Sequence, residues 1–150
     1  MRRSKLSTDE RGSASLEFVT AGMILLLPLV YLVLTMAAIQ AGALAVEGAA
    51  RQAARVFVQG DNLGDAQAKA LRAVEFALAD HGLTLAAASV SISCQPTPAN
   101  CLRRQGFVTV DVLVTVPLPL VPPVLTGDFP LAVPLTATAT QQVSRFWGSG

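Results

Sequence analysis

By the spacing of its hydrophobic residues, the chain divides into a charged N-terminal segment over residues 1–12, a long apolar part over residues 13–59 and a mixed part over residues 60–150. An uncharged apolar run extends from Phe18 to Ile39, and apolar positions at helical spacing continue from it as far as Phe57. At 1.5 Å per residue the run covers about 33 Å, enough to cross the hydrocarbon core of a bilayer. Because backbone groups in lipid must bond one another, the pattern predicts one long helix over residues 13–59, membrane-spanning at about residues 17–40. Pro28 is expected to bend this helix.

The part after the long helix, residues 60–150, changes from helical to alternating spacing. Turn residues at 60–64 precede a predicted helix over 66–80, capped by Asp65, with an apolar stripe of Ala70, Leu71, Val74 and Leu78. Alternating apolar and polar residues then predict strands over 85–94, 107–116 and 135–143. We therefore expect an α+β fold in which a roughly three-stranded antiparallel sheet packs its apolar face on a helix.

The segment 117–134 is rich in proline, with leucine and valine between the prolines. Since proline cannot donate to a strand ladder, we expect an extended loop here rather than a strand. Its apolar side chains are a candidate contact surface for partners or lipid headgroups, and a loop folded back over the sheet is an equal alternative.

Composition and charge exclude several classes of protein. Hydrophobic residues make up 52% of the chain, charged residues only 14%, and the net charge is +1. This balance excludes a cytosolic globule, a disordered polar chain and, for lack of a basic stripe, a nucleic-acid binder. Because the chain has a single histidine, two cysteines and no carboxylate cluster, we expect that the protein is not an enzyme and that it binds no cofactor and no metal ion. That histidine, His81, precedes Gly82 as in an ordinary helix C-terminus.

The flanking charges predict the orientation in the membrane. Basic residues gather in residues 1–12, whereas the other flank of the apolar run begins with Glu47. Lysine and arginine are retained in the cytoplasm, so residues 1–12 are expected inside and residues 60–150 outside. A secretory signal peptide cut near Ala43 is the competing interpretation. It is disfavoured because the apolar run is longer than a signal peptide needs and the helical pattern continues past that site.

The two cysteines, Cys94 and Cys101, flank a turn-rich connector between two predicted strands. Outside the membrane, in an oxidising compartment, such a pair is typical of a structural disulfide. Closing so short a loop stabilises a fold by about 2–3 kcal/mol in the chain-entropy model.

One carboxylate, Glu17, stands at the start of the apolar run without a partner in its own segment. An ionised carboxylate is costly in lipid and normally has a partner. If the chain is cut after Gly12, Ser13 gains a free amine, which could pair with Glu17 of a neighbouring subunit in a bundle of parallel helices. Gly12 suits such a cut because a residue without Cβ lets a protease approach the backbone closely.

The wording around this site, RGSASLEFVTAGMILLLPLV, resembles the TadE-like family of the tight-adherence (Flp-type) pilus machinery. The likeness extends over 11–59 and, more weakly, to LTATATQQV near the C-terminus. It implies a cytoplasmic prepilin-type leader over residues 1–12, removed between Gly12 and Ser13 by a membrane prepilin peptidase. It also implies that Glu17 and Phe18 serve assembly of a minor pilin or pseudopilin. The implied partners are membrane lipid, that peptidase, other pilin subunits and the pilus assembly machinery.

The residues alone also permit a different class of protein. In that alternative the chain is an uncleaved single-pass membrane protein whose extracytoplasmic part is a binding module. The proline-rich loop 117–134 would be its ligand surface, and Glu17 would be a helix-start residue tolerated at the headgroup level.

Overall fold

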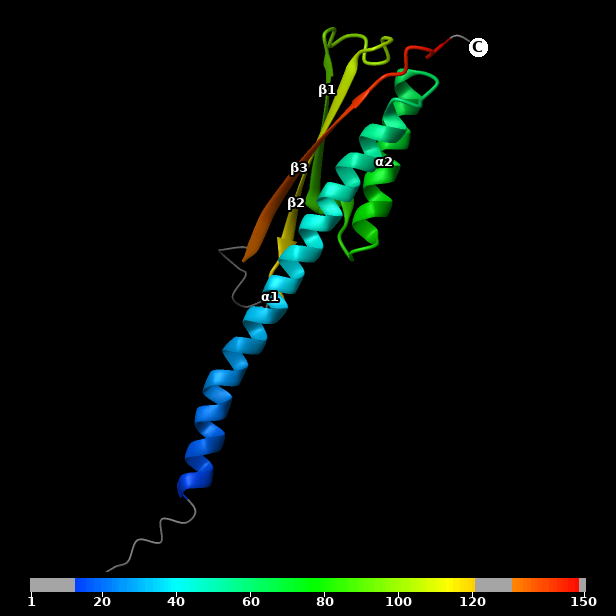
Figure 1. Cartoon of the computed structure of the whole chain (residues 1–150). Coiled ribbons are helices and arrows are strands. Elements are labelled where there is room, and N and C mark those ends of the chain that lie inside the picture. Colours follow the sequence, from blue (N-terminus) through cyan, green and yellow to red (C-terminus); the bar gives the residue numbers. More distant parts are fainter. Residues whose placement is uncertain (1–12, 121–130, 149–150) are drawn as a thin grey trace, which may run out of the picture.

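A computed structural model describes residues 13–120 and 131–148, and it confirms the expected α+β class with a long apolar N-terminal helix (Figure 1). Its first part, α1, extends well beyond a head formed by all the other elements, which lie along its C-terminal half. The elements are α1 (Ser13–Phe57), α2 (Leu63–Ala79), the short 3-10 helix η1 (Leu85–Ala87), β1 (Ala88–Gln95), β2 (Phe107–Pro117) and β3 (Ala132–Gln142).

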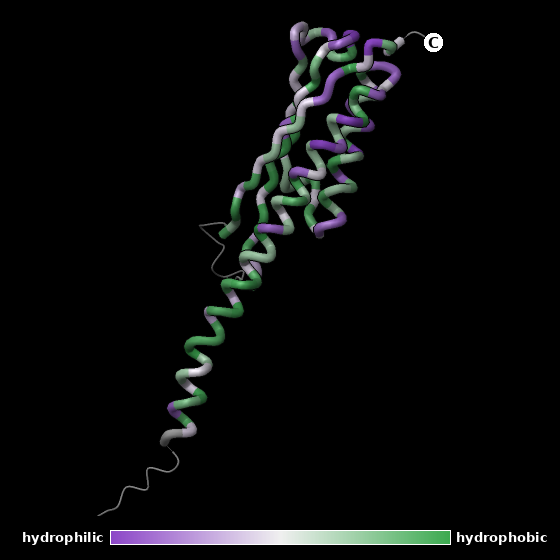
Figure 2. Tube along the Cα trace, in the orientation of Figure 1, coloured by the Kyte–Doolittle hydropathy of each residue, from purple (hydrophilic) through white to green (hydrophobic). Residues whose placement is uncertain are grey.

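Helix α1 is one element of 45 residues that continues through Pro28. Its N-terminal half is almost uniformly hydrophobic along the trace, whereas polar positions become frequent where the head begins (Figure 2). Its C-terminal half buries a stripe made mostly of small side chains, which lets both α2 and the sheet approach the helix closely. That stripe comprises Ala45, Val46, Ala49, Ala50, Ala53, Ala54 and Phe57, each no more than 1% exposed.

The sheet has the order β1-β2-β3, and both pairs of strands are antiparallel. On the central strand β2 the predicted alternation is confirmed, since its inward-facing residues are buried and Thr109 and Asp111 lie on the opposite face. This inner face packs against α1, so the sheet and α2 share α1 as their support. The buried residues of β2 are Val108, Val110, Val112, Val114 and Val116.

Helix α2 begins earlier than its apolar spacing predicts. Asn62, not Asp65, is the N-cap: the Asn62 side-chain oxygen accepts a hydrogen bond from the Asp65 backbone N–H at 3.0 Å. Leu71 is also placed differently from the prediction, being 43% exposed. The buried stripe has a strict four-residue spacing and consists of Ala66, Ala70, Val74 and Leu78.

Two glycines mark the closest approaches in the head. A Cβ atom at Gly42 would lie 2.6 Å from Cγ2 of Val116 and 2.9 Å from Cδ1 of Leu135, so α1 touches the sheet there. A Cβ atom at Gly60 would lie 2.6 Å from both Cα and Cβ of Ala66, where the chain turns from α1 into α2. Both positions need a residue without a side chain.

The strand ends correct the predicted proline-rich loop. Strand β2 continues to Pro117 and β3 already begins at Ala132, so both ends of the predicted 117–134 loop belong to the sheet. Pro134 fits because β3 is an edge strand, where a missing N–H need not break a ladder. The start of the first predicted strand is wrong as well, because residues 85–87 form η1 instead. Residues 121–130 of the loop lie outside the described residues.

Candidate functional site

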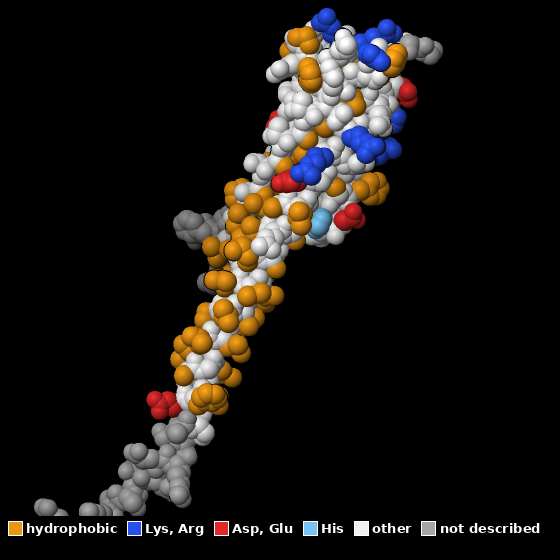
Figure 3. Space-filling view, in the orientation of Figure 1, with side chains coloured by type: hydrophobic (Ala, Val, Ile, Leu, Met, Phe, Trp, Pro, Cys, Tyr) orange, Lys and Arg blue, Asp and Glu red, His pale blue; other side chains and the backbone are white. Residues whose placement is uncertain are grey.

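The N-terminal half of α1 presents its apolar side chains outward. From Leu16 to Met36 every large hydrophobic side chain is between 38% and 80% exposed, and none belongs to the buried core or to the partly buried residues packed against it. Figure 3 shows these side chains covering the helix from its beginning to the point where the head starts. The helix is long and apolar enough to cross a membrane. So large an uncovered apolar surface is typical of a segment that contacts lipid or other apolar helices, and this helix could be a membrane anchor.

Polar groups in this half are compatible with a lipid environment. The hydroxyl of Thr20 donates to the Leu16 carbonyl at 2.7 Å, and that of Thr35 donates to the Tyr31 carbonyl at 2.8 Å. Both hydroxyls are thus satisfied within the helix itself. Glu17 is the only carboxylate between Ser13 and Ile39.

Glu17 and Phe18, the two residues implied for assembly, lie adjacent on the first turns of α1 and are both exposed; Phe18 is 80% exposed. Glu17 has no cation within 4.0 Å among the described residues. Gly12, the predicted cleavage position, lies outside the described residues, and Ser13 is the first residue of α1.

Cys94 and Cys101 form a disulfide, as predicted, with 5.1 Å between their Cα atoms. Cys94 ends the buried face of β1, and the bridge closes the connector that leads toward β2. The structure describes no free cysteine. The bridge therefore serves to hold the end of the head that is farthest from the apolar half of α1 (Figure 1).

The described residues contain no group of three or more histidine, cysteine, aspartate or glutamate side chains arranged to hold a metal ion. His81 lies just after α2, where Gly82 has φ +70° and the Leu83 N–H donates to the Leu78 carbonyl at 3.0 Å. This geometry is that of a helix C-cap, in agreement with the structural interpretation of His81.

Exposed ion pairs lie on the surfaces of α1 and α2. Arg51 and Glu47 pair at 2.5 Å, as their i,i+4 spacing predicts. On α2, Lys69 contacts Asp65 at 2.6 Å. The Lys69 ammonium and the Asp61 backbone N–H both donate to the Asp65 carboxylate and lower its pKa, while the same carboxylate raises the pKa of Lys69.

Comparison of the chain with protein-family models, with curated proteins and with solved structures found no match.

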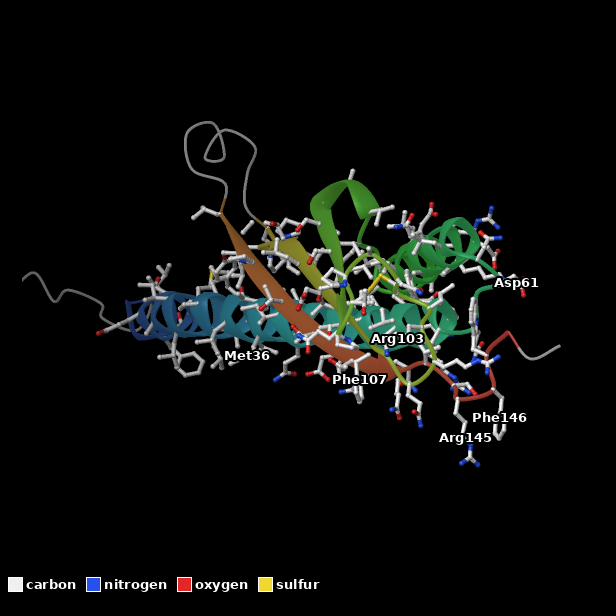
Figure 4. All side chains as sticks on the ribbon, turned by 90° about the horizontal axis from the view of Figure 1, so that it is seen from above. Met36, Asp61, Arg103, Phe107, Arg145 and Phe146 are labelled. Atoms are coloured by element: carbon white, nitrogen blue, oxygen red, sulfur yellow. A yellow bond between two sulfur atoms is a disulfide. The ribbon has the colours of Figure 1, made fainter. Side chains whose placement is uncertain are left out.

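Sequence reasoning missed a cluster of residues at the distal end of the head. Arg103 and Arg104 come from the β1–β2 connector and Arg145 from the segment after β3 (Figure 4). A signal for it exists in the sequence: residues 94–107 and 140–148 together contain these three arginines and no acidic residue. The signal is weak because the two segments are far apart along the chain and meet only through the fold of the sheet.

Proposed function

We propose that this chain is a TadE-like minor pilin or pseudopilin, a structural or assembly subunit of a tight-adherence type IV pilus. The observation that carries the proposal is the division of one unbroken helix. The apolar N-terminal half of α1 is uncovered, while its C-terminal half is the central support of a small head. Such a helix can be held in a bilayer and can then pack among like helices without change to the head.

Glu17 supports the same proposal through its position. It is an exposed carboxylate on the first turns of an otherwise uncharged helix. After a cut between Gly12 and Ser13, the new amine of one subunit is a suitable partner for the Glu17 of its neighbour, because both lie in the first turns of their helices. The two groups are about 6 Å apart along the axis, so neighbouring helices offset by about one turn bring them together. Phe18, beside it, adds apolar contact area for the neighbouring helix.

The orientation follows from the same proposal and from the charge distribution. Residues 1–12 are placed in the cytoplasm by their basic side chains. The head and its disulfide are then outside, where a disulfide persists. The chain acts as a single-pass protein of the cell membrane that is available for incorporation into a surface pilus.

The deciding experiment is co-expression of the full chain with and without a prepilin peptidase. Intact mass and N-terminal sequencing are expected to find Met1 without the peptidase and Ser13 with it. Gly12→Val is expected to block the cut. If the peptidase leaves Met1 in place, the proposal is wrong, and the uncleaved membrane-anchored binding module is the better description. A new N-terminus near Ala43 would instead indicate a secretory signal peptide.

A second experiment tests Glu17 itself. Glu17→Ala is expected to leave the protein in the membrane fraction but to lower its amount in sheared surface filaments at least about tenfold, the effect of losing about 1.4 kcal/mol of pairing. The matched control is Glu47→Ala, which removes an exposed carboxylate from the same helix outside the apolar half. Equal incorporation of the Glu17 variant and the wild type would contradict the role in assembly.

A further inference from the structure

The end of the head farthest from the apolar half of α1 carries an exposed cationic and aromatic surface. Arg103, Arg145, Phe107 and Phe146 lie at this end, and Phe107, Arg145 and Phe146 extend toward the same side of the head (Figure 4). Phe107 is 46% and Phe146 is 65% exposed. The guanidinium carbon of Arg145 lies 4.7 Å from the centre of the Phe146 ring. Exposed rings beside arginine are typical of binding surfaces.

The charge of this surface is not neutralised within the described part of the chain. The ion pairs found there involve Arg51 and Lys69 only, both on the helices. Asp61, the acidic residue labelled in Figure 4, lies on the other side of the head's end, and its carboxylate faces Lys69 at 3.8 Å. The surface therefore has complementary charge for an anionic partner.

This end of the head is held in place by several independent bonds. The Gln105 N–H donates to the Val143 carbonyl at 3.1 Å, and the Val143 N–H donates to the Gly106 carbonyl at 2.8 Å, so the two arginine-bearing segments are tied together. The Trp147 indole N–H donates to the Gly60 carbonyl at 3.0 Å. A surface fixed in this way loses little conformational entropy on binding.

Two arginines already use part of their donor sets to shape the surface. The Arg104 Nε donates to the Trp147 carbonyl at 2.8 Å, and an Arg103 guanidinium N–H donates to the Thr97 hydroxyl at 3.2 Å. Among the described residues no acceptor is found for the remaining donors of each planar fork, which can therefore take a carboxylate. Between these side chains lies a hollow of about 480 Å³, the size of a small-ligand site. It is lined by Asn100, Leu102, Arg103, Arg104, Trp147 and Gly148.

Beside Phe107 the outer face of the sheet continues the surface with neutral polar groups, and the Asp111 carboxylate follows farther along β2, where it accepts a hydrogen bond from the Thr138 hydroxyl. Phe107 is flanked in register by Gln95 and Gln142, both exposed. In the next row outward-facing hydroxyls follow, and those of Thr109 and Thr140 lie 2.9 Å apart. An aromatic ring between amide and hydroxyl groups suits a sugar, whose apolar C–H face stacks on the ring while its hydroxyls bond to the flanking side chains.

From this juxtaposition we propose that the distal end of the head binds a carboxylated polysaccharide, a polymer containing uronic acid residues. The arginine forks pair with the carboxylates, Phe107 and Phe146 stack on sugar rings, and the amide and hydroxyl row bonds to the sugar hydroxyls. An extended acidic peptide would use the arginines but leave the ring and amide row without a partner. A nucleic acid would require a longer cationic track along its backbone than three arginines supply.

Trp147 is the only tryptophan of the chain and lines the hollow, so its fluorescence reports binding at this place. The full chain in detergent micelles is titrated with polygalacturonate and with its fully methyl-esterified form, which keeps the same backbone and linkage but has no charged carboxylate. We expect a saturable change in fluorescence with polygalacturonate, weakened by salt, and none with the methyl ester. The same response to both polymers, or no response to polygalacturonate, overturns the proposal. Tighter binding of poly-glutamate or of a DNA oligonucleotide overturns the assignment to a polysaccharide.

Variants separate the roles of charge and ring. Arg103→Gln and Arg145→Gln are each expected to weaken binding about tenfold, and Arg145→Lys less, since lysine keeps the charge but loses the fork. Phe146→Ala is expected to weaken polygalacturonate binding several-fold. The matched control is Arg72→Gln on α2, expected to bind like the wild type. Unchanged circular dichroism establishes that each variant folds. Equal weakening by Arg72→Gln, or full binding by both Gln variants of the site, refutes the proposal, whether or not the chain assembles into pili.

Discussion

The contact between α1 and the sheet at Gly42 yields a test of the packing of the head. Gly42→Ala gains about 1 kcal/mol from helix propensity. Against this, the new Cβ lies 2.6 Å from Cγ2 of Val116, whose stiff, branched side chain is only 4% exposed and cannot move unless β2 moves. Overpacking of this kind costs about 1–3 kcal/mol, so the net effect is a loss of up to about 2 kcal/mol. The Cδ1 atom of Leu135, at the end of a more flexible side chain, can move aside.

Gly48→Ala is the matched control because it lies on the same helix and a Cβ there meets no atom within 4 Å. It is expected to stabilise the protein by the full propensity gain. Thermal unfolding of the micelle-bound chain is measured by circular dichroism, where 1 kcal/mol corresponds to a shift in Tm of about 4 °C. The control should melt higher than the wild type and Gly42→Ala lower. Equal stabilisation by the two substitutions would refute the close contact between α1 and β2.

Three further predictions concern the head. Replacing both Cys94 and Cys101 by alanine should lower the free energy of unfolding by about 2–3 kcal/mol, measured by denaturant titration, and dithiothreitol should reproduce the loss in the wild type. The lowered pKa of Asp65 contributes stability that is present above its ordinary pKa of 3.8 and is lost as the pH falls through the folded-state value. Asp65→Asn, which also releases Lys69, should therefore make thermal stability less sensitive to acid, and an unchanged acid sensitivity would contradict the pairing. Trp147→Phe removes the bond to the α1–α2 turn and should raise amide exchange in residues 143–148.

The hydrophobic pattern predicts most of this fold because, in long segments with a regular period, burial of the apolar face outweighs local preferences in determining the structure. The alternating valines of β2 indicate a strand with one buried face, and the apolar stripe in the C-terminal half of α1 indicates a helix face that packs against other elements. The predictions from the sequence are wrong mainly at the ends of helices and strands. Asn62 and Asp65 are both good caps three residues apart, and the choice between them depends on the turn at Gly60. Pro134 suggested a loop, but its place on an edge strand removes the penalty, and strand order cannot be read from the local sequence.

Part of the candidate site can likewise be predicted from the sequence, and part depends on the fold. The apolar run and Glu17 are contiguous in the sequence, so their combination is visible without a structure. The surface at Arg103 and Arg145 depends on pairing between β2 and β3, which brings together segments about 40 residues apart. Single-sequence periodicity carries no information about that pairing, and an isolated arginine pair is ordinary on a protein surface.

The direction of the strands has a mechanical consequence. The described chain begins at one end of the molecule, at Ser13, and ends at the other, just after β3 (Figure 1). The β2–β3 ladder extends from Phe107 paired with Gln142 to Pro117 paired with Ala132. The N-terminal end of β2 and the C-terminal end of β3 both lie at the distal end, so a pull between that end and the N-terminal end of α1 draws the two strands in the same direction. The tension therefore falls on the packing of the sheet against α1, which is loaded in shear along its length instead of being separated one residue at a time.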